Sequence, residues 1–298
     1  MAETDVTRIA GNIGAMNALN SLATINKQLS IHQTRLATGK RINSAADDPA
    51  GLTIATKMDT RSQGLGVALD NIADAKNLLS VAESGVGKIN DILVQMHDKA
   101  LSGASDTMGD DERKAIAVQL KAYAAQIDDI VGQTKWNDKK LIDGSFDGSS
   151  TASTLVFQTG SDQGDTTSLT DGVSNLDSSA SGLNITMSTA LYNDAVSTNV
   201  TVGKASDFSG YLTSLESAMT KVNGEMSKIG AMTGRLTFKE DQVSASKLNI
   251  EAAYNRVMNA NMADEQVQSS KYQILQQTST AMLAQANAAP QFLLSLFK

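Results

Sequence analysis

The chain has 298 residues and carries 25 Lys and Arg against 32 Asp and Glu, a formal net charge of -7 at pH 7. Its 41% hydrophobic and 19% charged residues exclude a disordered chain, and the negative charge disfavours nucleic acid and anionic membranes as partners. Cysteine is absent, which excludes disulfides, thiolate metal ligands and cysteine nucleophiles, and His32 and His97 are the only histidines.

The sequence was searched for a secretion signal and for a membrane-spanning segment. Residues 1–8 contain two acids and one base, and no apolar segment follows them. No apolar stretch approaches the ~18–20 residues that cross a bilayer. We therefore expect neither a cleavable secretion signal nor a membrane anchor.

Long helices are predicted on both sides of the middle of the chain. The only prolines are Pro49 and Pro290, and proline inside a helix costs about 3 kcal/mol. Apolar residues recur at steps of three and four, the spacing of a narrow seam between packed helices. The runs with this spacing are 15–36, 65–100, 116–130 and 212–257. The seam of the first run is Ala15, Ala18, Leu22, Ile25, Leu29, His32 and Leu36.

Stop and start signals separate these predicted rods. Gly39 is placed to end the first helix in a left-handed cap. The pair Asp48–Pro49 is typical of a helix start, with an N-cap followed by proline at the first helical position. Residues 102–109 divide the second rod from the third, for which Thr107 or Asp110 is the predicted cap.

The middle of the chain has a different composition. Residues 145–206 are rich in Ser, Thr, Gly, Asn and Asp. Short strands are predicted at 154–158, 183–187 and 199–202, with a turn at 160–164. The order is therefore helices, a small β-containing insert, and helices again.

No pattern for catalysis or ligand binding is visible. His32 falls on a helix seam, where packing or pH sensitivity is the ordinary role, and no zinc-type spacing surrounds His97. The acidic groups at 47–48 and 110–112 fit helix starts, where they meet the positive end of the helix dipole. We predict no catalytic residue, no metal site, no cofactor and no enzymatic activity.

The two ends of the chain need a partner. Residues 9–36 and 273–298 are largely apolar, carry few charges and are prone to form helices. Such surfaces are not left in water, so they pair with each other or with neighbouring copies. The second alternative couples folding to assembly.

Four separated segments resemble the conserved motifs of bacterial flagellin, in the family's order. They are RIAGNIGAMN at 8–17, RLATGKRINSAADDPAGL at 35–52, QTKWNDKKLIDGS at 133–145 and QILQQTSTAMLAQANAAPQFLLSL at 273–296. The resemblance covers roughly residues 8–145 and 205–298 and leaves the middle as the family's variable region.

The resemblance implies a mainly α fold, with long antiparallel helical rods in a coiled-coil bundle and a small β-hairpin region. Its implied divisions are a terminal-helix domain (D0) at 1–34 and 267–298, a connecting spoke at 35–48 and 258–266, a helical domain (D1) at 49–144 and 207–257, and a surface β-hairpin and loop region at 145–206 without full outer domains.

The resemblance also implies where copies touch. The D0 residues expected at subunit contacts are Ile9, Ile13, Met16, Leu19, Leu22, Ile274, Leu275, Leu283, Phe292, Leu293 and Phe297. The family-signature residues of the spoke are Arg35, Leu36, Arg41, Ile42, Asn43, Asp47, Asp48 and Gly51.

The implied function is that of a structural subunit. Many copies assemble into the extracellular filament that drives motility, after export in unfolded form through the flagellar type III apparatus. The implied partners are a secretion chaperone, the filament cap protein and the hook-filament junction protein. Residues 95–102 lack the two arginines of the stretch that innate-immune receptors recognise in many flagellins, so this activity is not expected.

Two alternatives stay open. A hook-filament junction protein shares the terminal motifs but does not form long filaments. A secreted enzyme or adhesin would use the helical ends for export and carry its activity in the middle, for which about 60 polar residues are too few.

Overall fold

The computed structural model describes residues 12–146, 154–169, 174–179, 181–185 and 204–295. Its elements in chain order are α1 (Ile13–Thr38), α2 (Pro49–Gly103), α3 (Asp110–Gln133), β1 (Lys135–Trp136), β2 (Lys139–Lys140), β3 (Leu155–Gln158), β4 (Thr166–Leu169), α4 (Ala205–Met258) and α5 (Met262–Ser295). The chain divides into two compact units, one of residues 1–61 and 248–298 and one of residues 62–247. The mainly α prediction with a small hairpin region is confirmed.

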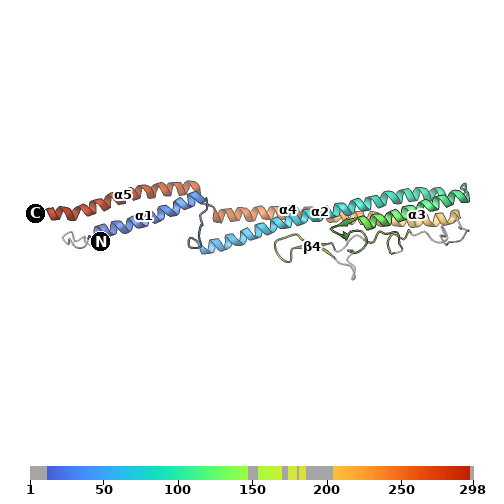
Figure 1. Ribbon diagram of the computed structural model, residues 1–298, viewed down its shortest axis with the longest axis horizontal. Helices are drawn as coiled ribbons and strands as arrows, with labels where there is room; N and C mark the ends of the chain where they lie inside the picture. Colours follow the sequence, from blue (N-terminus) through green and yellow to red (C-terminus); the bar gives the residue numbers. More distant parts are fainter. Residues whose placement is uncertain (1–11, 147–153, 170–173, 180, 186–203, 296–298) are drawn as a thin grey trace. The chain divides into compact units, whose positions relative to one another are not determined.

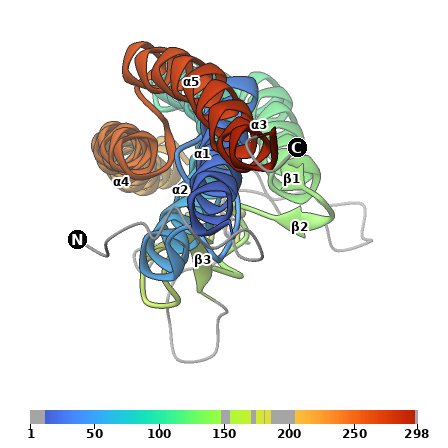
Figure 2. The same ribbon diagram turned by 90° about the vertical axis from the view of Figure 1, so that its left-hand side faces the viewer.

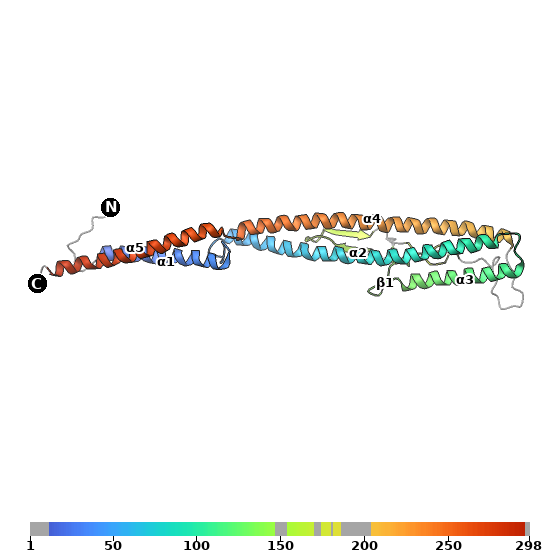
Figure 3. The same ribbon diagram turned by 90° about the horizontal axis from the view of Figure 1, so that it is seen from above.

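In the unit of residues 62–247, α2, α3 and α4 run side by side (Figures 1 and 3). One face of each helix is buried, and the apolar steps of three and four predicted for these runs follow that face. Fully buried members include Ile72 and Ile89 of α2, Leu120 of α3 and Leu215 of α4. Lys76 of α2 and Glu240 of α4 form an ion pair of 2.8 Å between the two longest helices.

In the other unit, α1 and α5 run antiparallel beside each other (Figures 1 and 2). Backbone hydrogen bonds join the segment that follows α1 to the segment that precedes α5. Arg41 N donates to Met258 O at 2.6 Å, and Ala260 N donates to Gly39 O at 3.0 Å. This unit also contains the first turns of α2 and the last turns of α4.

The predicted end of α1 and the predicted start of α2 are confirmed. Gly39 caps α1 with φ of 70°, a left-handed conformation that glycine adopts at little cost. The Asp48 carboxylate accepts a hydrogen bond from Gly51 N at 2.9 Å, and Pro49 is the first residue of α2. Because no proline interrupts it, α2 continues for 55 residues, about 80 Å at 1.5 Å per residue.

The predicted cap of the third helix is wrong. Gly109, not Thr107 or Asp110, is the N-cap of α3, and no side chain bonds to the free amides there. Asp110, Asp111 and Glu112 lie in the first turn, where their charge meets the helix dipole instead.

Two small hairpins follow α3 in the chain. The β1–β2 hairpin lies beside α3 (Figure 2) and turns through Asn137 and Asp138, whose φ values of 47° and 63° are those of a type I′ turn. The β3–β4 hairpin pairs Leu155 with Leu169. β3 and the turn at 160–164 confirm the prediction, whereas β1, β2 and β4 were not predicted.

The strand predicted at 183–187 is wrong for the residues that the structure describes. Residues 183–185 form a turn in which Leu183 N donates to Asp177 O at 2.8 Å and Ile185 N to Ser178 O at 3.2 Å. The apolar side chains of Leu183 and Ile185 are buried, although the two residues do not belong to a strand. The strand predicted at 199–202 lies outside the described residues.

Candidate assembly surface

The seam between α1 and α5 follows the predicted face of α1. Leu29 is buried, and Ala15, Ala18, Leu22, Ile25, His32 and Leu36 are half-buried along the same face. Contacts between the helices occur along their length. Asn12 Nδ2 donates to Ala286 O at 2.8 Å, and Gln276 Nε2 donates to Asn26 Oδ1 at 2.8 Å.

The α5 side of this seam is unusually polar. Glu265 and Ser269, one turn apart, are 9% and 4% exposed. Further along the same face, Tyr272 and Gln276 are half-buried. A half-buried leucine, Leu283, follows only towards the C-terminal end of α5. A helix normally buries its apolar stripe, so this arrangement is inverted.

Glu265 is held by two groups of α1. Its Oε2 lies 2.5 Å from His32 Nδ1, and its Oε1 accepts a bond of 3.3 Å from Arg35 Nη1. The His32 ring stacks on Tyr272, with centroids 5.2 Å apart and planes 17° from parallel. His32 was correctly placed on a helix seam by its spacing. Glu265 was not found, because no sequence signal shows which acid of α5 faces α1.

Several large apolar side chains of the pair are exposed, outside the seam. Ile13, Met16 and Leu19 of α1 are 58%, 64% and 56% exposed, and Ile274 and Leu275 of α5 are 63% and 37% exposed. Val267, Met282 and Met262 add to the exposed apolar surface of α5. Large exposed apolar areas mark contact sites with other molecules.

The remaining predicted contact residues are distributed differently. Leu22 and Leu283 are half-buried on the seam between α1 and α5. Phe292 and Leu293 fall within the bounds of α5, and Ile9 and Phe297 lie outside the described residues.

The family-signature residues meet where α1 leads into α2. Ile42 is 2% exposed and packs with Ala55 and Met258. A Cβ atom on Gly51 would lie 2.8 Å from Ile42 Cδ1, so only glycine leaves room for this packing. The Arg41 guanidinium donates twice to Val257 O, at 3.0 and 3.2 Å.

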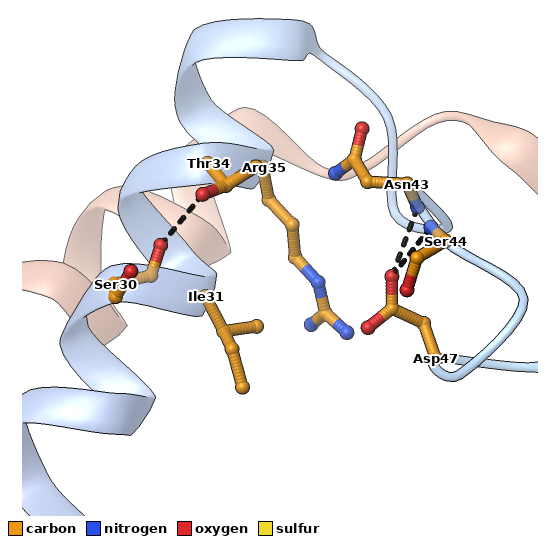
Figure 4. Close-up of a pocket in the computed structure, with 7 residues that line it drawn as sticks. All are labelled: Ser30, Ile31, Thr34, Arg35, Asn43, Ser44 and Asp47. Atoms are coloured by element: carbon orange, nitrogen blue, oxygen red, sulfur yellow. Dashed lines mark hydrogen bonds between the residues drawn. The ribbon is translucent and has the colours of Figure 1, made fainter.

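Asp47 organises the rest of this connection. Its carboxylate accepts bonds from Asn43 N at 3.0 Å and Ser44 N at 2.9 Å, and these bonds lower its pKa below the ordinary value of 3.8. A shallow pocket of about 200 Å³ separates Asp47 from the end of α1, and the Arg35 side chain crosses it towards Asp47 (Figure 4). Small polar side chains and Ile31 line the rest, which gives the pocket no catalytic or metal-binding set.

In the unit of residues 62–247, three polar side chains hold residues 174–179 and 181–185 against the helices. Glu225, 3% exposed, accepts bonds from Ser174 and Lys228, and Asp128 accepts two bonds from Ser178. The buried Tyr211 hydroxyl donates to Ile185 O at 2.9 Å, and burial raises its pKa. These residues were not found from the sequence, because their partners are distant in the chain.

Over the described ranges, no group of three or more His, Asp or Glu side chains could hold a metal ion. None of the helices described combines the length and hydropathy that a bilayer crossing requires. Long helices packed along apolar seams, with one antiparallel pair that exposes apolar side chains, define the class, a helical bundle protein.

Comparison with known proteins identifies the family within this class. The bacterial flagellin N-terminal helical region matches residues 9–147, and the bacterial flagellin C-terminal helical region matches residues 212–297. The chain is 32% identical to a flagellin of Bacillus subtilis (strain 168) over 307 residues, covering 98% of this chain and 100% of the relative. The chain belongs to the bacterial flagellin family, a family of structural proteins.

Other relatives are consistent with this assignment. The flagellar filament 33 kDa core protein of Treponema phagedenis is 29% identical over 293 residues, covering 96% of this chain and 98% of the relative. A solved structure of a putative flagellar hook-associated protein from Vibrio parahaemolyticus has a TM-score of 0.58 at 20% identity, covering 72% of this chain and 100% of that one. Such low identity shows the fold alone. Because relatives named flagellin match nearly the whole chain, the hook-filament junction alternative is not favoured.

Proposed function

We propose that this chain is the subunit that assembles into the extracellular flagellar filament. The observation that carries the proposal is the inverted α1–α5 pair, which buries Glu265 and exposes Ile13, Met16 and Ile274. Burying one such apolar side chain stabilises a contact by roughly 1.5–3 kcal/mol. Several of them on two adjacent helices make a strong contact once another copy covers them.

The same contact repeats from copy to copy. A contact between two different surfaces of one molecule does not close on itself, and so it builds a helical polymer. In the proposed filament, residues 1–34 and 267–298 form the inner domain around a channel, with 35–48 and 258–266 as the connecting spoke. Residues 49–144 and 207–257 pack outside them, and 145–206 face the medium.

The proposal includes the route of the subunit and its action. The chain passes unfolded through the flagellar type III apparatus, after a secretion chaperone has covered its C-terminal helix. It folds under the filament cap protein, onto a filament that begins at the hook-filament junction protein. Two slightly different side-by-side packings of the long helices then set the supercoil that turns motor torque into thrust.

A single charge on the exposed apolar face tests the assembly step. In Ile274→Lys the ammonium group would be buried against the next copy, so the concentration at which filaments form should rise at least about tenfold. Gln277→Lys adds the same charge at an exposed polar position on α5 and is the matched control. Electron microscopy after seeding with wild-type filament fragments gives the readout.

Removal of residues 291–298 tests the end of the chain. We expect a soluble helical subunit that no longer polymerises, because the apolar terminus is lost. Normal filaments from the truncated chain, or equal growth of the two lysine variants, would contradict the proposed assembly surface.

A further inference from the structure

The exposed apolar face of α5 requires an explanation, because nothing in the hydrophobic effect keeps it outward. Val267 and Ile274 lie seven residues apart, about two turns, on one side of the helix, and both are more than 60% exposed. If α5 rolled about its axis, these side chains would pack against the apolar seam of α1. Hydrophobic burial favours that roll.

Glu265 opposes the roll. It is 9% exposed, and its two oxygens are engaged separately by His32 and Arg35, at 2.5 and 3.3 Å. Rolling α5 would withdraw the carboxylate from both partners and leave Arg35 without its opposite charge on this face. The Glu265 side chain is 11% exposed and that of Arg35 25%, so the carboxylate would lose its partners in a largely dry position, which is unfavourable.

Other contacts across the seam are weaker constraints on this rotation. Asn26 is exposed and Gln276 is half-buried, and their mutual bond joins two uncharged groups. The bond from Asn12 ends on a backbone carbonyl of α5 and selects no particular side chain. The backbone bonds of Arg41 with Met258 and of Ala260 with Gly39 hold the segment before α5, and neither of them involves a side chain of α5.

We propose that Glu265 is a positioning residue, which sets the rotation of α5 and keeps its apolar face outward for assembly. Glu265 holds this rotation through its bonds to His32 and Arg35, and the Tyr272 ring stacks on His32. The assembly part of this inference rests on the proposed function, whereas the rotation of α5 does not.

Single cysteines can measure the rotation directly, because the chain contains none of its own. Ser269→Cys places a thiol on the seam, and Ile274→Cys places one on the outward face, at positions 4% and 63% exposed. With Glu265 present, a maleimide should modify the thiol at 274 at least about tenfold faster than the thiol at 269. Glu265→Leu should reverse this order while circular dichroism shows retained helix, and filament growth should be lost.

Two further variants separate positioning from general stability. Asp264→Leu removes the neighbouring exposed acid and should change neither the thiol order nor growth. Glu265→Gln keeps the shape and one acceptor oxygen but removes the charge, so it should reduce the preference for the thiol at 274 without reversing it.

The outcomes distinguish the two proposals. If both thiols react equally fast in Glu265→Leu, the carboxylate only stabilises the helix pair, and the positioning role is wrong. An unchanged thiol order in that variant, or equal reactivity with Glu265 present, also overturns it. If the order reverses but the wild-type protein never forms filaments, the positioning role stands and the proposed function fails.

Discussion

Gly85 and Gly87 stand two residues apart in α2, and their surroundings differ completely. A Cβ atom on Gly85 would lie 2.7 Å from Thr134 Oγ1 and 3.3 Å from Ile142 Cδ1. Thr134 cannot easily turn away, because its hydroxyl donates to Ile130 O at 2.7 Å. Gly87 faces open space within 4 Å of its Cβ position. The first glycine permits close packing, and the second contributes only the conformational cost of glycine in a helix.

Alanine at these positions should therefore have opposite effects. Gly85→Ala should lower the free energy of unfolding by about 1–3 kcal/mol, because the added methyl overpacks the contact with Thr134. Gly87→Ala, the matched control, should raise it by up to about 1 kcal/mol through helix propensity. Urea unfolding followed by circular dichroism measures both, and equal effects would contradict the packing described.

Among the elements, the segment that connects α1 with α2 depends most on polar groups. Gly39 ends α1, Asp47 gathers the amides of Asn43 and Ser44, and Asp48 starts α2. The flanking helices are predictable from hydrophobic spacing alone. This segment is held by the packing of Ile42 and by bonds to the Asp47 and Asp48 carboxylates, so part of its stability depends on pH.

Acid should loosen this connection in a defined direction. The pKa of Asp47 is lowered in the folded chain, so its stabilising effect is present above the ordinary value of 3.8 and is lost as pH falls through the lower folded value. We therefore expect the backbone amides of residues 41–48 to exchange faster, relative to the intrinsic rates of an unfolded peptide, only when the pH is below the lowered pKa of Asp47 in the folded chain. Asp47→Ala should show the faster exchange already at neutral pH, and equal protection in the two proteins there would contradict this role.

At the scale of the molecule, every copy carries a formal charge of -7. Identical copies therefore repel one another as they approach, while the exposed faces of α1 and α5 attract by hydrophobic burial. The repulsion acts over about 10 Å at 0.1 M salt and over a shorter distance at higher salt, whereas apolar contact is not screened.

Added salt should consequently speed filament growth. Seeded growth at pH 7 should be several-fold faster in about 0.5 M than in about 0.01 M sodium chloride, because the screening length falls severalfold. Light scattering measures the rate, with a neutral osmolyte at matched osmolarity as the control. Slower growth at high salt would show that attraction between opposite charges, not apolar burial, dominates the contact.

The sequence by itself determined the helices, their long uninterrupted course and the seam of α1. Steps of three and four, the lack of proline from residue 50 to 289, and capping signals at Gly39 and Asp48 are local properties of the chain. The β1–β2 hairpin was not predicted, because each of its strands has two residues, too few to show an alternating pattern. The turn at 183–185 was not predicted, because it depends on bonds with residues outside it, including the bond from the Tyr211 hydroxyl to Ile185 O.

Only the tertiary structure decided which face of α5 meets α1. Its sequence has apolar residues on more than one side, so spacing alone does not select between a buried and an exposed Ile274. The choice falls to Glu265, whose charge must leave water beside His32 and Arg35. A requirement for two partners 230 and 233 residues away in the chain cannot be read from local periodicity.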